Sequence, residues 1–250
     1  MRLATSPRRV LFLATLIAAG TLAAPALAQD ISINFGQGNG GVTERAIQLI
    51  ALLTVLSIAP SILIMMTSFT RIVVVLSLLR TALGTATAPP NSVIIALAMF
   101  LTAFVMGPVL QKSYDEGIKP LVASQIGVED ALQKAAVPLR SFMQKNVREK
   151  DVKLFMDMSG EQPPATAEEM SLRILVPAFM ISELKRAFEI GFLLFLPFLI
   201  IDLVVASVLM SMGMMMLPPV VVSLPFKLIF FVLVDGWSLV AGSLVQSYGG

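Results

Sequence analysis

The sequence contains no cysteine and no histidine among its 250 residues. Without these side chains, the chain cannot form a disulfide, a His/Cys metal site or a Ser–His–Asp triad. Charged residues are also scarce, at 14% of the chain, whereas apolar residues make up 56%. This composition is typical of integral membrane proteins. We therefore expect a membrane protein that is not an enzyme and that uses no cofactor or metal.

The first 28 residues have the three parts of a cleavable signal peptide. Arg2, Arg8 and Arg9 form a basic start, which is followed by an apolar core and a cleavage site of sequence ALA. An uncleaved anchor helix is the alternative interpretation. Without segment 1–28 the chain has 15 basic and 16 acidic residues. The excess of positive charge is therefore a targeting feature, and it predicts no nucleic-acid partner.

The rest of the chain alternates between apolar and polar stretches. Four apolar segments have about the ~20 residues that a helix needs to cross a bilayer. They are residues 46–66, 92–110, 190–217 and 220–245. We expect a flexible leader (29–45), a first hydrophobic helical pair (46–111), a helical insert (112–189), and a second hydrophobic pair with a Met-rich loop (190–250). With the signal peptide cleaved, four crossings place the insert in the periplasm.

The apolar segments have features that lipid-facing helices avoid. Each contains a proline, which removes a helical hydrogen bond and is expected to interrupt the helix. These prolines are Pro60, Pro108, Pro197 and Pro225. Backbone groups freed in this way are tolerated at membrane depth only inside protein or beside water. We therefore expect an all-α membrane protein of kinked helical hairpins that pack against other subunits.

The polar insert has the residue spacing of amphipathic helices. Leu139, Phe142 and Met143 recur at helical spacing. Further along, Thr166 and Glu169 have the spacing of a capping box, which predicts a new helix over residues 170–188.

Six charged residues lie within or beside the apolar runs. They are Arg71, Arg80, Glu183, Asp202, Lys227 and Asp235. Because an isolated charge is costly at membrane depth, we expect them to be buried as pairs that fix the register of subunits in an oligomer. Lys227 and Arg71 are the candidate partners for the aspartates. Arg71 and Arg80, which flank residues 72–79, can instead anchor a helix end at the membrane interface.

Two of the acidic residues also allow a functional interpretation. Asp202 and Asp235 are carboxylates inside apolar runs, and such pairs commonly mark a proton relay in membrane proteins.

Other residues of the insert have two interpretations each. Glu183, with Lys185 and Arg186, forms either an exposed ion-pair face or a contact between protomers. Phe142 and Phe155 are core residues in the simplest interpretation and interface anchors in the other.

Residues 211–219 (SMGMMMLPP) form the most informative segment of the chain. The glycine before the methionine run and the proline pair after it prevent an uninterrupted helix. Methionine is flexible and polarizable, so a loop of this kind at membrane depth suits a deformable constriction. A membrane turn that is simply rich in methionine is the alternative. The methionines concerned are Met212, Met214, Met215 and Met216.

Six motifs occur in order along the chain. They are residues 66–76 (MTSFTRIVVVL), 79–84 (LRTALG), 88–91 (APPN), 212–219 (MGMMMLPP), 224–227 (LPFK) and 234–237 (VDGW). Together they closely resemble the FliP family of flagellar type III export-gate proteins. The resemblance extends over about residues 43–248, which is almost the whole mature chain.

This resemblance implies a function that composition alone does not predict. FliP-like proteins form a five-subunit ring that joins the FliQ and FliR proteins in a conical helical assembly. Unfolded flagellar proteins leave the cytoplasm through that assembly. In the family, a Met-rich loop is the gasket that closes the resting channel, and Met214, Met215 and Met216 are the matching positions here.

The resemblance thus implies a homo-oligomeric channel subunit in the bacterial inner membrane, within the flagellar basal body. Its implied partners are FliQ, FliR, other export-apparatus membrane proteins and unfolded protein substrates. A proton-coupled transporter that uses Asp202 and Asp235 is the alternative function.

Overall fold

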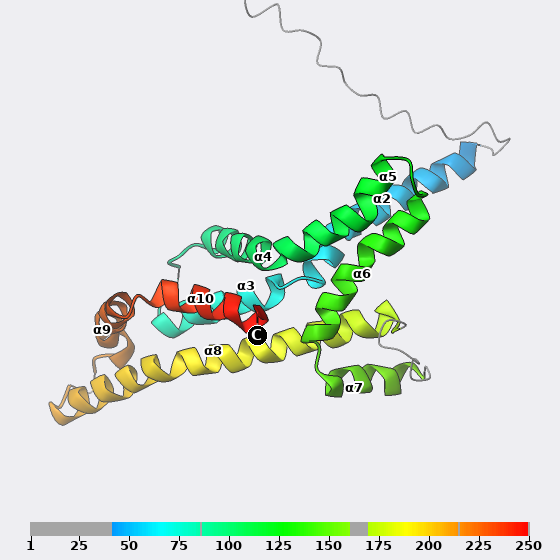
Figure 1. The fold of residues 1–250 in the computed structure, drawn as a ribbon. Helices are drawn as coiled ribbons and strands as arrows, with labels where there is room; N and C mark the ends of the chain where they lie inside the picture. The colour runs from blue at the N-terminus through cyan, green and yellow to red at the C-terminus, as the bar shows by residue number, and fades with distance from the viewer. Residues whose placement is uncertain (1–41, 86, 161–169, 215, 250) are drawn as a thin grey trace, which may run out of the picture. The chain divides into compact units, whose positions relative to one another are not determined.

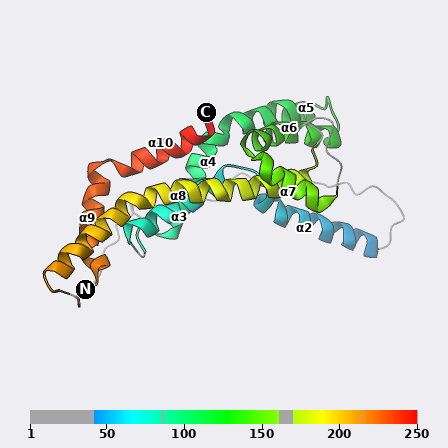
Figure 2. The same ribbon diagram turned by 90° about the horizontal axis from the view of Figure 1, so that it is seen from below.

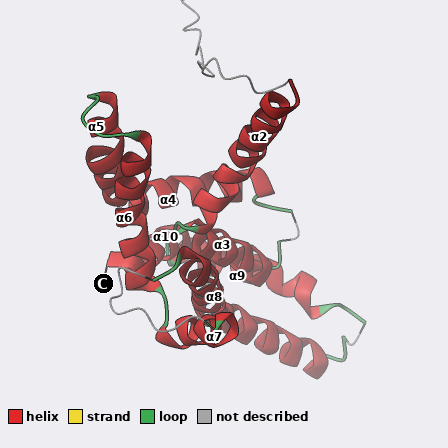
Figure 3. Ribbon diagram, turned by 90° about the vertical axis from the view of Figure 1, so that its right-hand side faces the viewer, coloured by secondary structure: helices red, strands yellow, loops and turns green. Residues whose placement is uncertain are grey.

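The computed structural model describes residues 42–85, 87–160, 170–214 and 216–249. Within these ranges every regular element is helical and none is a strand, so the predicted all-α class is confirmed there (Figure 1, Figure 3). The elements are α2 (Val42–Met65), α3 (Phe69–Leu83), α4 (Asn91–Ser113), η1 (Tyr114–Ile118), α5 (Lys119–Val122), α6 (Val128–Asn146), α7 (Glu149–Ser159), α8 (Leu172–Ser211), α9 (Pro219–Leu233) and α10 (Gly236–Gly249). The signal peptide and residues 29–41 of the leader lie outside the described residues.

The chain divides into two units, Met1–Ala51 and Leu52–Gly250. In the second unit the core is built around α3, which lies alongside α8 (Figure 1, Figure 2). Gly191 of α8 permits this close approach, because a Cβ there would lie 2.3 Å from Cδ1 of Leu78. One face of α3 is at most 1% exposed, and it consists of Ile72, Val75, Leu76 and Leu79. The short apolar segment 72–79 is therefore part of a buried core helix.

The polar insert shares its core with α8. Met143 of α6 is fully buried in a cluster with Leu175 and Phe179 of α8. The π-helical turn η1 packs directly on α6, since a Cβ at Gly117 would lie 2.6 Å from that of Ala135. The insert is thus attached along α8 by its own apolar side chains.

Helix α8 is a single helix of 40 residues. The sequence predicted a helix over residues 170–188 and a separate apolar segment from residue 190, but the chain continues as one helix across that boundary. Charged residues mark the boundary, and charge does not end a helix as a Gly–Pro stop does. The N-cap is Ser171, whose side chain accepts a hydrogen bond from the backbone N–H of Arg173. The predicted capping residues, Thr166 and Glu169, lie outside the described residues.

The prolines do not interrupt the helices, and that prediction is wrong. Pro108 lies inside α4, Pro197 inside α8 and Pro225 inside α9, and α2 also continues through Pro60. A proline removes one hydrogen bond of the ladder, whereas the neighbouring bonds and the packing of a long helix remain.

Two helical stretches of the described chain are long and apolar enough to cross a membrane, Asn91–Val122 and Leu172–Ser211. The predicted segment 220–245 is not one helix, because α9 and α10 meet at an angle of 63°. Between them Asp235 adopts a positive φ of 50°. In the part of the chain that the structure describes, two helices, or three if the bent pair crosses as one, are thus long and apolar enough to span a membrane. The first predicted segment, 46–66, lies in α2, where several side chains lie outside the described residues, so that span stays a prediction.

Candidate functional site

The Met loop, which we define as residues 212–218, joins α8 to α9. Helix α8 ends at Ser211, and Gly213 then adopts a positive φ of 73°, which glycine accepts without strain. The backbone N–H of Met214 donates to the carbonyl of Leu209 at 3.0 Å. The loop is therefore anchored to the last turn of α8 by its backbone.

The methionines of the Met loop differ in exposure. Met216 is 98% exposed and Met212 is 65% exposed, whereas Met214 is partly buried. Met215 lies outside the described residues. Within this chain the end of the hairpin thus presents thioether side chains that no neighbouring element covers.

The hairpin of α8 and α9 is held together by one polar cluster, the hairpin tie, formed by Asp202, Ser223 and Lys227. Nζ of Lys227 lies 2.7 Å from Oδ2 of Asp202, and the Ser223 hydroxyl donates to Oδ1 at 2.5 Å. Lys227 also donates to the carbonyl of Ala82 at 3.2 Å, at the end of α3, where the helix dipole favours a cation. Of the two candidate partners for Asp202, Lys227 is the one that pairs with it, and it does so within the same chain.

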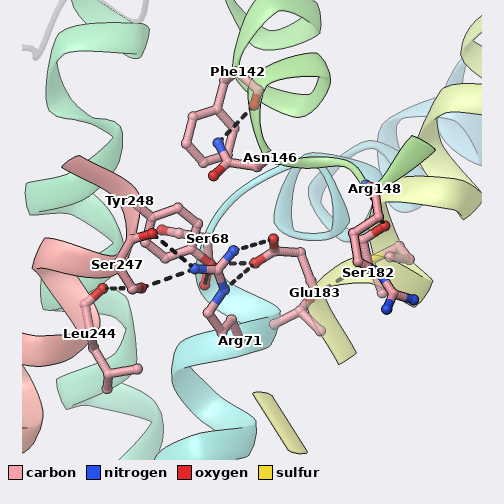
Figure 4. A network of polar contacts seen from close by, with 12 residues as sticks. Ser68, Arg71, Phe142, Asn146, Arg148, Ser182, Glu183, Leu244, Ser247 and Tyr248 are labelled. Carbon is pink, nitrogen blue, oxygen red and sulfur yellow. Dashed lines mark hydrogen bonds and ion pairs between the residues drawn. The ribbon is translucent and has the colours of Figure 1, made fainter. Parts of the chain in front are cut away.

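A second ion pair, fully buried, joins α3 to α8 (Figure 4). Arg71 donates two hydrogen bonds to Glu183, at 2.9 and 2.5 Å. Its third nitrogen donates to the Ser247 hydroxyl at 2.9 Å, and its Cζ lies 3.8 Å from the ring centroid of Tyr248. The Tyr248 hydroxyl donates to Glu183 in turn. Helices α3, α8 and α10 therefore meet at one polar network.

This network corrects two interpretations of the sequence. Arg71 is not a partner of Asp202, because it binds Glu183. The exposed-face interpretation of Glu183, with Lys185 and Arg186, is also wrong, because Glu183 is 0% exposed.

Sequence reasoning missed the hydroxyl groups at both ion pairs. Ser223 supports the hairpin tie, and Ser247 and Tyr248 complete the Arg71 network. The available signal was the presence of polar side chains in α9 and α10, which are otherwise apolar helices.

Arg80 and Asp235 join neither cluster. Arg80 donates to the side chain of Asn91 at 2.5 Å and to the carbonyl of Pro89 at 3.2 Å, and so holds the loop before α4. Asp235 is exposed between α9 and α10, and it forms no ion pair with a residue that the structure describes. No hydrogen bond joins Asp202 to Asp235 in that part of the chain.

Phe142 and Phe155 pack against the core of the chain. The ring centroid of Phe142 lies 6.0 Å from that of Phe179, edge-on, and 5.8 Å from that of Tyr248, stacked. Phe155 packs against the small cluster around Val152. Both side chains stay partly exposed, and a role as interface anchors stays a prediction.

Asp151 links α7 to α8 beside the buried ion pair. The residue is 4% exposed, and its carboxylate accepts hydrogen bonds from the Ser182 hydroxyl at 2.6 Å and from Arg148 at 2.8 Å. Burial raises the pKa of Asp151, but the Ser182 hydroxyl and the Arg148 guanidinium outweigh it and hold this pKa below its ordinary value. Because Ser182 precedes Glu183, α8 binds the insert and α3 through successive residues.

Asp151→Asn is expected to lower the free energy of unfolding by about 2 kcal/mol at pH 7, because the variant loses hydrogen bonds to a charged group. The carboxyl has a folded-state pKa below the ordinary 3.8, so its contribution is complete well above that pH and is lost as the pH falls through the folded-state pKa. The difference in melting temperature between wild type and variant should therefore shrink below about pH 4. Asp157→Asn, exposed on the same helix, is the control. A difference that is the same at pH 7 and pH 3 would contradict this assignment.

The fold and the site together define a class of protein, a helical membrane protein with long apolar helices, ion pairs buried within the chain, and an exposed methionine loop. The model of the FliP family matches residues 52–244. The chain belongs to the FliP family, and the resemblance seen in its motifs is confirmed.

The chain is similar to the flagellar biosynthetic protein FliP of several bacteria. It is 62% identical to that of Caulobacter vibrioides over 93% of this chain and 87% of the relative. It is 55% identical to that of Bacillus subtilis over 82% of this chain and 93% of the relative. It is 50% identical to that of Aquifex aeolicus over 87% of this chain and 91% of the relative.

Proposed function

We propose that this protein is a core channel subunit of the flagellar type III export gate. Its copies form a ring of kinked helical hairpins, with five as the expected number, together with the FliQ and FliR proteins. Unfolded flagellar proteins cross the inner membrane through this assembly, and the insert faces the periplasm. Membership of the FliP family and the apolar helices support the broader statement, that the chain is a membrane component of the flagellar export apparatus.

The observation that carries the channel role is the end of the α8–α9 hairpin. Residues 203–222 contain no charged side chain, and Met216, in the loop between the two helices, is 98% exposed. A ring of such loops makes an apolar constriction, which excludes water and so blocks ions. Because methionine side chains are flexible, the same constriction can re-pack around a passing polypeptide.

Replacement of Met214, Met215 and Met216 by alanine tests this role. We expect ions to leak through the resting channel while secretion continues, because the loop keeps its course but loses the side chains that seal it. Ion leak across the membrane and export of flagellar subunits are measured together. Met158→Ala, at an exposed methionine of α7, is the control, and the resting channel of this variant should not leak ions. Loss of export without an ion leak would instead support a transporter. If neither the leak nor the export changed, the protein would be an assembly scaffold without a pore of its own.

The ring itself is tested by the mass of the complex in mild detergent, with and without co-expressed FliQ and FliR. A discrete particle with several copies of this chain is expected, and a monomer in both preparations would contradict the ring. The proton-relay alternative has no specific support, because Asp202 is bound by Lys227 and Ser223 and makes no contact with Asp235 among the described residues.

A further inference from the structure

The α8–α9 hairpin carries an apolar cavity beside the Met loop. The cavity has a volume of about 560 Å³ and lies between the two arms of the hairpin. Its walls are apolar side chains on one face of α8 between Ile200 and Leu209, together with Met212 of the Met loop and Val222 and Phe226 of α9. Protein interiors are usually close-packed, so a space of this size between two arms is room for further apolar side chains.

The cavity extends from the level of the hairpin tie, at Ile201 and Phe226, to Met212 of the Met loop. In the described residues, the bonds of Asp202 to Ser223 and Lys227 are the only hydrogen bonds between α8 and α9. Towards the Met loop the polar side chains bond only within their own helix, as Ser207 does to the carbonyl of Leu203. Helices α8 and α9 are therefore joined by hydrogen bonds at the hairpin tie, and no hydrogen bond among the described residues joins them near the Met loop.

The Met loop can reach this cavity. Met212 already lines it, and Met216 lies four residues further along the chain, so about 13 Å of extended backbone at most separates the two. Gly213 lies between them, has a positive φ, and has no neighbouring atom within 4 Å of where a Cβ would be. Rotation about Gly213 can thus bring Met214 and Met216 over the cavity while α8 and α9 stay in place, with loss of the hydrogen bond from the Met214 N–H to the Leu209 carbonyl.

We propose that this cavity receives the side chains of Met214 and Met216 when the channel opens. The inference rests on the proposed channel function, because it supplies the place to which the loop withdraws. In the closed state Met216 projects from the hairpin, and a passing polypeptide displaces it. Withdrawal into the cavity exchanges an exposed thioether for a buried one, and an unbranched side chain fills such an irregular space well.

A bulky side chain in the cavity tests the proposal in the assembled complex. Val205→Trp fills the space from the α8 side and should lower secretion about tenfold, because the withdrawn state becomes overpacked, while the resting channel stays tight to ions. Val221→Trp makes the same change on an exposed part of α9 outside the cavity, and should secrete normally. Normal secretion by an assembled Val205→Trp complex would overturn the inference. The channel function would still stand if the alanine variant of the three methionines leaks.

A disulfide trap gives the second test, since the natural sequence contains no cysteine. In a Val205→Cys/Met216→Cys chain, oxidation should form a bond within one chain that holds the loop in the cavity. The channel should then leak ions until a reductant is added, whereas each single cysteine variant should stay tight. Absence of the disulfide, or disulfides that only join two copies, would overturn the proposal, because the cavity would then hold another occupant such as a neighbouring chain.

Discussion

Arg71→Met is expected to lower the free energy of unfolding by about 3–5 kcal/mol, the usual effect of removing one member of a buried ion pair. Glu183 would stay fully buried, with only the Tyr248 hydroxyl bound to its carboxylate. The change also removes the cation from the Tyr248 ring and the hydrogen bond to Ser247, so α10 loses its contacts with the guanidinium on α3 and keeps its apolar packing there. Denaturant unfolding of the purified chain in detergent measures the effect.

Two further variants separate the ion pair from a general effect of the substitution. Arg71→Met/Glu183→Met should recover most of the lost stability, because replacing both members of a buried pair by apolar groups is often close to neutral. Lys185→Met breaks an exposed pair with Glu189, whose members are 52% and 59% exposed, and should change stability by less than about 1 kcal/mol. If Arg71→Met proves as stable as Lys185→Met, the buried pair makes no net contribution to folding.

Lys227→Met is expected to lower the free energy of unfolding by about 3 kcal/mol, near the lower end for a buried pair, because Asp202 is 29% exposed. The variant leaves Asp202 bound only by Ser223 and leaves the Ala82 carbonyl at the end of α3 without its cation. Since the hairpin tie is the polar link between α8 and α9, the melting temperature of the chain and the secretion rate should both fall.

Charge balance provides the comparison for Lys227. Lys227→Met/Asp202→Leu should be more stable than Lys227→Met alone, because no unpaired carboxylate remains. Lys119→Met, at a pair whose members are 70% and 49% exposed, should leave stability nearly unchanged. A double variant that is no more stable than the single one would refute the role of the ion pair in the tie.

The sequence predicted the helical class and the family, because these depend on composition and on contiguous motifs. For Asp202 it left two candidate partners, Lys227 and Arg71, and expected the pair to join subunits, whereas Lys227 pairs with Asp202 within one chain. The sequence could not predict that Arg71 pairs with Glu183, which lies 112 positions away. Helical periodicity shows that a residue lies on a buried face, but it does not identify the residue opposite. The same limit applies to Asp151 and Ser182, which lie 31 positions apart and bond to each other.

The bend between α9 and α10 was missed for a different reason. Hydropathy counts apolar residues and carries no information on chain direction, so residues 220–245 resembled one span. The Asp235–Gly236 pair inside that run was the available sign of a turn, because aspartate tolerates the left-handed conformation better than most residues. Gly236 then packs so tightly on Phe231 that a Cβ there would lie 2.1 Å from the ring.

Helix α8, with its 40 residues, is about 60 Å long, roughly twice the thickness of the hydrocarbon core of a bilayer. It holds one ion pair at Glu183 and another at Asp202. Each added or deleted residue between them would rotate one end of the helix by about 100° relative to the other. Glu183 and Asp202 could then not both face their partners, and the Met loop would turn away from its position relative to the insert. Substitutions along this stretch are therefore far easier to accommodate than insertions or deletions.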